Sequence, residues 1–251
     1  MNKWILFSLA SLVPQTILAA DIQATLQWSH RVELSTPVSG VIKSVDVEVG
    51  EVVKKGQILL SLDTTSFRAR TDQSQSEIVR MKAELAESKR DLGRVQELYE
   101  RTIVSTTDLD QAKLQVIKSQ SALSEAEARL RQYQQMLVDA TIRAPFDAVV
   151  VIRQAEPGQS VAAGLQPKML LTLAKSGEML ARMFLTSSQM DQLKQGQQLM
   201  VRVSEKNYTG NIKTLGLEPV KVKDESVYPV DVLFPISNPL RAGTPALVML
   251  P

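Results

Sequence analysis

The stretch PVSGVIKSVDVEVGEVVKKG, residues 37–56, is matched by a second stretch, PFDAVVVIRQAEPGQSVAAG, residues 145–164. Every residue of the second copy lies 108 positions after its counterpart, and the alignment needs no gap. Further along, the offset becomes 111, so that ILLSL, residues 58–62, aligns with MLLTL, residues 169–173. Both copies contain short β-branched runs with glycine at turn positions, a pattern typical of tight β-hairpins.

Each copy is too small to bury its own apolar face, so we expect the two copies to pack on each other as one β-module. The glycine spacing supports their equivalence, since Gly50 matches Gly158 and Gly56 matches Gly164. Chance similarity between two Val- and Gly-rich regions is the alternative, and the gapless glycine spacing argues against it.

Between the copies, the apolar residues recur in steps of alternately four and three positions. This heptad pattern predicts two successive helices that pack along one seam. The predicted seam residues are Ser74, Ile78, Met81, Leu85, Ser88, Leu92, Val95, Tyr99 and Thr102, then Leu109, Ala112, Val116, Ser119, Leu123, Ala126, Leu130, Tyr133 and Leu137. The other positions are mostly charged or small, which we interpret as a solvated face.

Residues 102–107 interrupt the heptads and predict a turn between the helices. The candidate capping residues of the second helix are Ser105, Thr106 and Thr107. Asp108 and Asp110 suit the positive N-terminus of that helix. We therefore expect an antiparallel hairpin that begins near Phe67 and projects roughly 50 Å, at ~1.5 Å per residue.

One apolar residue near the expected tip, Leu98, lies off the seam. A rotation of ~100° per residue places Arg94, Leu98, Arg101 and Ser105 on one face, about a quarter turn from the seam. Leu98 either covers the neighbouring helix or forms a docking point, with leucine as the apolar anchor and the arginines as a polar rim.

After the second copy, the sequence predicts further strands and one short helix. The expected strands are residues 178–185, 199–203, 208–215, 227–234 and 246–250, and residues 22–28 can add another. We expect the short helix to be capped by Thr186 or Ser187 and to contain Met190 and Leu193.

The N-terminus has the pattern of an export signal. Lys3 supplies a positive charge, residues 4–18 form an interrupted apolar run, and small residues follow at Ala19 and Ala20. We expect a signal peptide of residues 1–20, with an uncleaved anchor as the alternative. The chain has no cysteine, so it has neither a disulfide nor a thiol that could carry a lipid.

Charge and residue content argue against several classes of function. The net charge of +2 gives no electrostatic reason to expect nucleic acid binding. His30 is the only histidine, and neither a Gly-x-Ser-x-Gly turn nor a metal-ligand spacing occurs. Asp108 and Asp110 suit a helix start better than an acid/base pair. We expect no catalytic residue, no metal site and no cofactor.

A split β-module interrupted by a heptad hairpin resembles the periplasmic adaptor proteins of bacterial efflux systems, the membrane fusion proteins of the HlyD type, and RND-type adaptors in particular. TIRAPFDAVV, residues 141–150, is similar to the motif with which that family re-enters its β-module, except that Ala148 stands where the family usually has glycine. Arg94, Leu98 and Ser105 have the spacing found in adaptors that engage TolC-like channels.

The resemblance implies an elongated α+β fold with three modules. They are a split lipoyl-like β-sandwich at residues 32–62 with 140–175, a two-helix coiled-coil hairpin at 63–139, and a small β-barrel at 21–31 with 176–251. Gly196-Gln197 and Arg241-Ala242-Gly243 are similar to signals of that barrel. Many relatives carry a further membrane-proximal domain, which we do not expect beyond Pro251.

The function implied by the resemblance is that of a periplasmic adaptor. It would bridge an inner-membrane transporter, RND-type rather than ABC-type, to a TolC-like outer-membrane channel, and would support export of small molecules. The resemblance also implies self-association as a trimer or hexamer, and channel docking through Arg94, Leu98, Arg101 and Ser105.

Three alternatives remain open. The chain could serve an ABC-type or type I secretion system, or it could be a structural envelope coiled coil without a transport role. A carrier of lipoyl or biotin shares the β-module, but needs a modifiable lysine on the turn between the halves. Here the hairpin replaces that turn, and Lys54 and Lys55 lie inside the first half.

Overall fold

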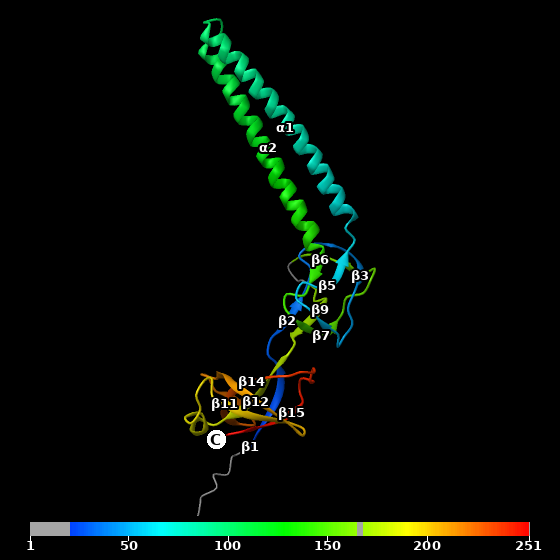
Figure 1. The fold of residues 1–251 in the computed structure, drawn as a ribbon, viewed down its shortest axis with the longest axis vertical. Helices are drawn as coiled ribbons and strands as arrows, with labels where there is room; N and C mark the ends of the chain where they lie inside the picture. The colour runs from blue at the N-terminus through cyan, green and yellow to red at the C-terminus, as the bar shows by residue number, and fades with distance from the viewer. Residues whose placement is uncertain (1–20, 165–167, 251) are drawn as a thin grey trace, which may run out of the picture. The chain divides into compact units, whose positions relative to one another are not determined.

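The computed structural model describes residues 21–164 and 168–250 (Figure 1). The expected signal peptide, residues 1–20, lies outside the described residues. The chain divides into two compact units, one formed by Arg31–Ala174 and the other by the residues that flank it on both sides. The predicted fold class, α+β with a β-module, a helical hairpin and a barrel, is confirmed.

The β-module of the first unit consists of short strands in two sheets. The strands are β2 (Arg31–Leu34), β3 (Gly40–Val45), β4 (Val52–Val53), β5 (Ile58–Leu62), β6 (Thr141–Arg143), β7 (Ala148–Arg153), β8 (Ser160–Val161) and β9 (Leu171–Lys175). One sheet has the order β2-β9-β7-β4 and the other β6-β5-β3-β8. Each sheet combines both copies of the repeat, because β4 pairs with β7 and β8 pairs with β3.

The two copies make equivalent hydrogen bonds to each other. The Gly50 N–H donates to the Val150 carbonyl at 2.8 Å, and the Gly158 N–H donates to the Ile42 carbonyl at the same distance. Both glycines have a left-handed φ, +89° and +82°, which glycine adopts without steric cost. Since Gly50 matches Gly158 and Ile42 matches Val150 in the repeat, the copies are related by an approximate two-fold. The prediction that they pack on each other is confirmed.

The core of the β-module is built from both copies. Its fully buried leucines are Leu59, Leu60, Leu62, Leu170, Leu171 and Leu173. Phe67, in the first turns of the hairpin, belongs to the same core. Ala148 begins β7 and is also buried, so the alanine that replaces the usual glycine lies in a strand and not in a strained turn.

The hairpin consists of α1 (Thr65–Glu100) and α2 (Thr106–Asp139), which lie side by side and antiparallel (Figure 1). The residues buried along the seam are Ser74, Ile78, Met81, Leu85 and Ser88 in α1 and Leu109, Ser119, Leu123 and Ala126 in α2. All of them are predicted seam positions. With 36 residues, α1 is about 54 Å long at ~1.5 Å per residue.

Two polar contacts across the seam define its register. The Ser88 and Ser119 hydroxyls lie 2.8 Å apart, and the Arg129 guanidinium binds both carboxylate oxygens of Glu77, at 3.0 and 3.2 Å. Both contacts join α1 to α2, so a shift of one helix against the other would break them together.

The seam opens toward the tip, and here the heptad prediction is partly wrong. Leu92 and Val95 are only half-buried, and Tyr99 is exposed. Thr102 lies beyond α1, which ends at Glu100. The first turn of α2 has no apolar side chain before Leu109, so the last turn of α1 has little apolar surface to pack against.

The second unit is a closed β-barrel. Its elements are β1 (Asp21–Trp28), β10 (Glu178–Leu185), α3 (Ser187–Met190), β11 (Gln198–Val203), β12 (Lys206–Leu215), β13 (Val220–Val222), β14 (Glu225–Pro235) and β15 (Pro245–Met249). The strand order is β10-β1-β15-β11-β12-β14-β13, and β14 also pairs with β10 and closes the barrel. The strands expected from the sequence are confirmed, including β1, which pairs with β10 and β15.

The barrel core is formed by alternate residues of these strands. Its fully buried members include Leu26, Met179, Met183, Val201, Val232 and Phe234. Gly210 in β12 faces this crowded interior, because a Cβ there would lie 2.7 Å from a methyl of Val232. Only glycine allows so close an approach of β12.

Two details of the barrel differ from the expectation. The prediction that the short helix contains Leu193 is wrong, because α3 ends at Met190 and Leu193 follows in a turn. The Leu193 N–H donates to the Met190 carbonyl at 3.0 Å, three residues earlier, so this bond closes a turn and does not continue the α-helix. Strand β13 was not predicted. It forms a hairpin with β14 through Lys223 and Asp224, both at positive φ.

Candidate docking site at the hairpin tip

The tip comprises the last turns of α1, the connecting residues 101–105 and the first turn of α2. The chain leaves α1 through a backbone motif that fixes the turn. The Thr102 N–H donates to the Tyr99 carbonyl at 2.9 Å, and the Ile103 N–H donates to the Leu98 carbonyl at 3.0 Å. This pair of bonds, with Thr102 at φ +60°, is the Schellman motif.

Thr102 occupies the position in this motif where glycine is usual. A left-handed φ brings the Cβ of an L-residue close to its own carbonyl and costs roughly 1–2 kcal/mol. For a β-branched residue such as threonine this backbone conformation is an outlier. The tip therefore contains local strain, and the hydrogen bonds on either side hold the backbone in place.

The chain enters α2 through a capping box at Ser105. The Ser105 hydroxyl accepts a hydrogen bond from the Asp108 N–H, and the Asp108 carboxylate accepts from the Ser105 N–H at 2.9 Å. The Ser105 hydroxyl and amide together hold the pKa of Asp108 below its ordinary value. Of the three candidate capping residues, Ser105 is the cap.

Ser105 therefore has a structural role, and the rotation argument is wrong for this residue. Because α1 ends at Glu100, Ser105 lies at the start of α2 and not on the face that carries Leu98. Arg94 and Leu98 lie in α1, and Arg101 caps its C-terminus.

Three apolar side chains are exposed at the tip. The exposed fraction is 37% for Leu98, 39% for Tyr99 and 65% for Ile103. Only Leu98 was singled out from the sequence. Ile103 and its neighbour Val104 lie in the segment between the helices, where a search for heptads does not detect apolar residues.

The two arginines at the tip are paired within α1. Arg94 forms ion pairs with Asp91 and Glu87, and Arg101 with Glu97. Between 49% and 66% of each of these side chains is exposed. Exposed intrahelical pairs contribute only about 0.5 kcal/mol, so either guanidinium can turn to another carboxylate or carbonyl at small cost.

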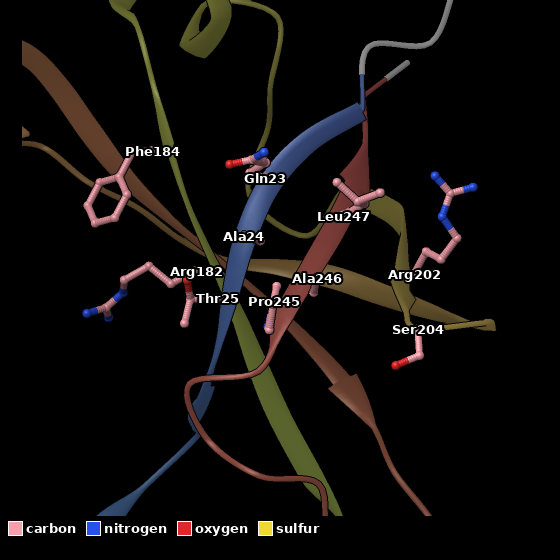
Figure 2. Close-up of a pocket in the computed structure, with 10 residues that line it drawn as sticks. All are labelled: Gln23, Ala24, Thr25, Arg182, Phe184, Arg202, Ser204, Pro245, Ala246 and Leu247. Carbon is pink, nitrogen blue, oxygen red and sulfur yellow. The ribbon is translucent and has the colours of Figure 1, made fainter.

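The barrel carries a shallow pocket of about 530 Å³ on its outer surface (Figure 2). Its charged lining residues are Arg182 and Arg202, which lie on opposite sides of β1 and β15. Arg182 already binds Asp231 at 2.7 and 2.8 Å, and Arg202 binds Asp21 at 2.6 Å. The pocket thus offers no unpaired charged side chain to orient a ligand, and it is a weaker candidate than the tip.

Among residues 21–164 and 168–250, no cluster of histidine, aspartate or glutamate could hold a metal ion. No helix in the part of the chain that the structure describes is long and apolar enough to cross a membrane.

Comparisons with known proteins agree with this architecture. The family model of the CzcB-like barrel-sandwich hybrid domain matches residues 30–175. The multidrug resistance protein MdtA of Cronobacter turicensis is 29% identical over 140 residues, which cover 56% of this chain and 34% of that protein. The macrolide export protein MacA of Yersinia pestis is 30% identical over 245 residues, which cover 89% of this chain and 65% of that protein. The chain thus spans less than two thirds of the length of these relatives.

The solved structures support the fold independently of sequence. The membrane fusion protein Spr0693 of Streptococcus pneumoniae matches with a TM-score of 0.74 at 15% identity, over 93% of this chain and 99% of that one. At this identity the likeness concerns the fold alone. The family match, in contrast, extends over more than half of the sequence and includes the split β-module and its hairpin. The chain therefore belongs to the CzcB-like family of barrel-sandwich hybrid proteins, the membrane fusion proteins that its sequence resembles.

Proposed function

We propose that this chain is a periplasmic adaptor that connects an inner-membrane transporter to a TolC-like outer-membrane channel. It acts by binding and has no chemistry of its own. The observation that carries the proposal is the hairpin, a rod about 54 Å long with exposed apolar side chains at its tip. Relatives named for multidrug resistance and macrolide export support a role in the efflux of small molecules.

The tip is the proposed contact with the channel. Leu98 supplies apolar surface, and Arg94 and Arg101 supply guanidiniums that can exchange their exposed intrahelical partners for groups on the channel. Ser105 contributes by holding the first turn of α2 in place through its capping box. An apolar centre with a charged rim is the usual anatomy of a protein interface.

The remaining partners follow from the same proposal. The signal of residues 1–20 would export the chain to the periplasm, where the barrel would lie near the transporter. The RND class of that transporter, in preference to the ABC class, stays a prediction, as does assembly into a trimer or hexamer. Purification of the chain with its bound transporter from membranes, followed by mass spectrometry and mass determination of the complex, tests both.

The test of the channel contact is photo-crosslinking in living cells. A photoreactive residue is placed at Leu98, and a control probe is placed at Lys82, an exposed position on the shaft of α1. The proposal expects an outer-membrane channel to be captured from Leu98 and not from Lys82. In parallel, Leu98→Asp should abolish efflux while the hairpin stays folded, because Leu98 lies outside the buried seam.

Capture of only a second copy of this chain from Leu98, or unchanged efflux in Leu98→Asp, would contradict the proposal. Leu98 would then be a packing residue, and a structural role in the envelope would become the better account of the hairpin.

A further inference from the structure

Ile103 is the most exposed apolar side chain of the tip, at 65%. Single exposed apolar residues are common on protein surfaces, so exposure alone has little meaning. What distinguishes Ile103 is that its backbone is fixed from both sides. Its own N–H donates to the Leu98 carbonyl, and the capping box at Ser105 begins two residues later.

The local strain at Thr102 sets the direction of this segment. The left-handed backbone at Thr102 reverses the chain directly before Ile103 and brings the Ile103 amide to the Leu98 carbonyl. A side chain presented by a fixed backbone loses less conformational entropy on binding than one in a mobile loop. Ile103 is therefore preorganised as well as exposed.

The Schellman motif also relates Ile103 to Leu98. In this motif, the residue after the left-handed position commonly packs against the residue whose carbonyl its N–H binds, and the contact shields both. Here those two residues are Ile103 and Leu98, yet 65% and 37% of their surfaces remain accessible. The pair forms an apolar projection that its own hairpin does not cover.

We infer that Ile103, together with Leu98, forms an apolar knob that inserts into an apolar pocket of the outer-membrane channel, and that Ile103 is its principal contact. This inference rests on the proposed function and adds a residue and a partner chemistry to it. The pocket would be rimmed by carboxylates or carbonyls, because Leu98 lies between Arg94 in α1 and Arg101 at the C-cap of that helix. Thr102 is a positioning residue, which acts by holding Ile103.

The chain offers a closely matched control. Val79 is also β-branched, is 63% exposed and lies on the shaft of α1, far from the tip in sequence. The experiment compares Ile103→Asp with Val79→Asp in the full-length protein that carries the photoreactive residue at Leu98. Neither substitution places a charge in the seam, so both variants should melt at the temperature of the unmodified chain.

The expected result is at least a tenfold loss of channel capture for Ile103→Asp, with capture by Val79→Asp within twofold of the parent. Ile103→Leu should retain capture, since it preserves the apolar volume. Ile103→Ala, which adds no charge, should lose capture as well. This variant keeps the test valid if the aspartate disturbs the fold.

Equal capture by Ile103→Asp and Val79→Asp, in cells where the parent captures the channel, would overturn the inference and leave the proposed function standing. Ile103 would then serve only the Schellman motif. Absence of capture by the parent itself would instead overturn the proposed function and this inference with it.

Discussion

Replacement of Leu123 by alanine should open the hairpin locally. Leu123 is buried in the seam, in one cluster with Ile78, Met81 and Leu85. The substitution removes three carbons, at about 0.8 kcal/mol for each buried group, or about 2.4 kcal/mol. A seam between only two helices can relax around the lost volume, so the additional cavity cost is small. We expect a loss of about 2.5 kcal/mol, roughly a 70-fold rise in the local opening constant.

Native-state amide hydrogen exchange measures this opening directly. The matched control is Leu114→Ala, the same substitution in the same helix at a side chain that is 48% exposed. It should leave exchange in the hairpin unchanged to within about 0.5 kcal/mol, as for other surface substitutions. Equal effects of the two substitutions, or a loss below about 0.5 kcal/mol at Leu123, would refute the seam register and the packing argument built on it.

Three further predictions concern strain, capping and charge. Thr102→Gly should stabilise the hairpin by about 0.5–1 kcal/mol in chemical denaturation, because relief of the left-handed strain exceeds the entropic cost of glycine; a loss of stability would show that Thr102 is not strained. Because the native pKa of Asp108 lies below its ordinary value, its cap stabilises α2 above about pH 4 and is lost as the pH falls through the native pKa. Protection of the first turn of α2 against exchange, after correction for the intrinsic pH dependence of amide exchange, should therefore fall on acidification, and Ser105→Ala, which keeps only the backbone hydrogen bond to Asp108, should weaken this pH dependence. In the barrel, Arg182→Met leaves the buried Asp231 carboxylate without its partner and should cost about 2 kcal/mol, less than for a fully buried pair because Arg182 is partly exposed. Thermal unfolding should show most of that loss restored when Asp231→Leu is added, and no restoration would contradict the ion-pair account.

The features that repeat in the sequence were predictable. Gly50 and Gly158 occupy the same position in the two copies of the repeat, which predicted two equivalent turns. The heptads predicted the buried seam from Ser74 to Ser88. The first prediction rests on the internal repeat, and the second rests on the heptad period, which helix geometry imposes on the chain. The barrel strands were predictable for the same reason, since their alternating pattern reflects one buried and one exposed face.

The features that a single residue decides were not predictable. The turn after α1 was predicted at residues 102–107, but the helix ends earlier, at Glu100, and no glycine marks that end because Thr102 adopts the left-handed conformation. Strand β13 was missed because its turn uses Lys223 and Asp224 in place of the usual Asn-Gly. In both cases a residue other than glycine or asparagine adopts a positive φ, and the sequence pattern does not mark the turn.

The candidate site was partly predictable for a related reason. Arg94 and Leu98 could be proposed together because both lie in α1, where position along the chain fixes the face, whereas Arg101 follows the last helical residue as the C-cap. Ile103 lies in the turn, where no period applies, and only the backbone hydrogen bond to Leu98 reveals its fixed position. The capping role of Ser105 needed the observed geometry to separate it from its two neighbouring threonines.

The exchange of β4 and β8 between the sheets has a consequence for how the chain folds. Neither copy of the repeat can complete its own sheet. The sheets can therefore form only after the second copy has been synthesised. The hairpin contains local contacts and can form early, and its closure brings the ends of the copies together, where the Leu62 N–H donates to the Ala140 carbonyl at 2.8 Å. Formation of the hairpin would thus also promote assembly of the β-module, because it brings the two copies of the repeat together. The hairpin can change its length during evolution when the same number of heptads is added to, or removed from, both helices. Such changes leave the two ends of the hairpin side by side.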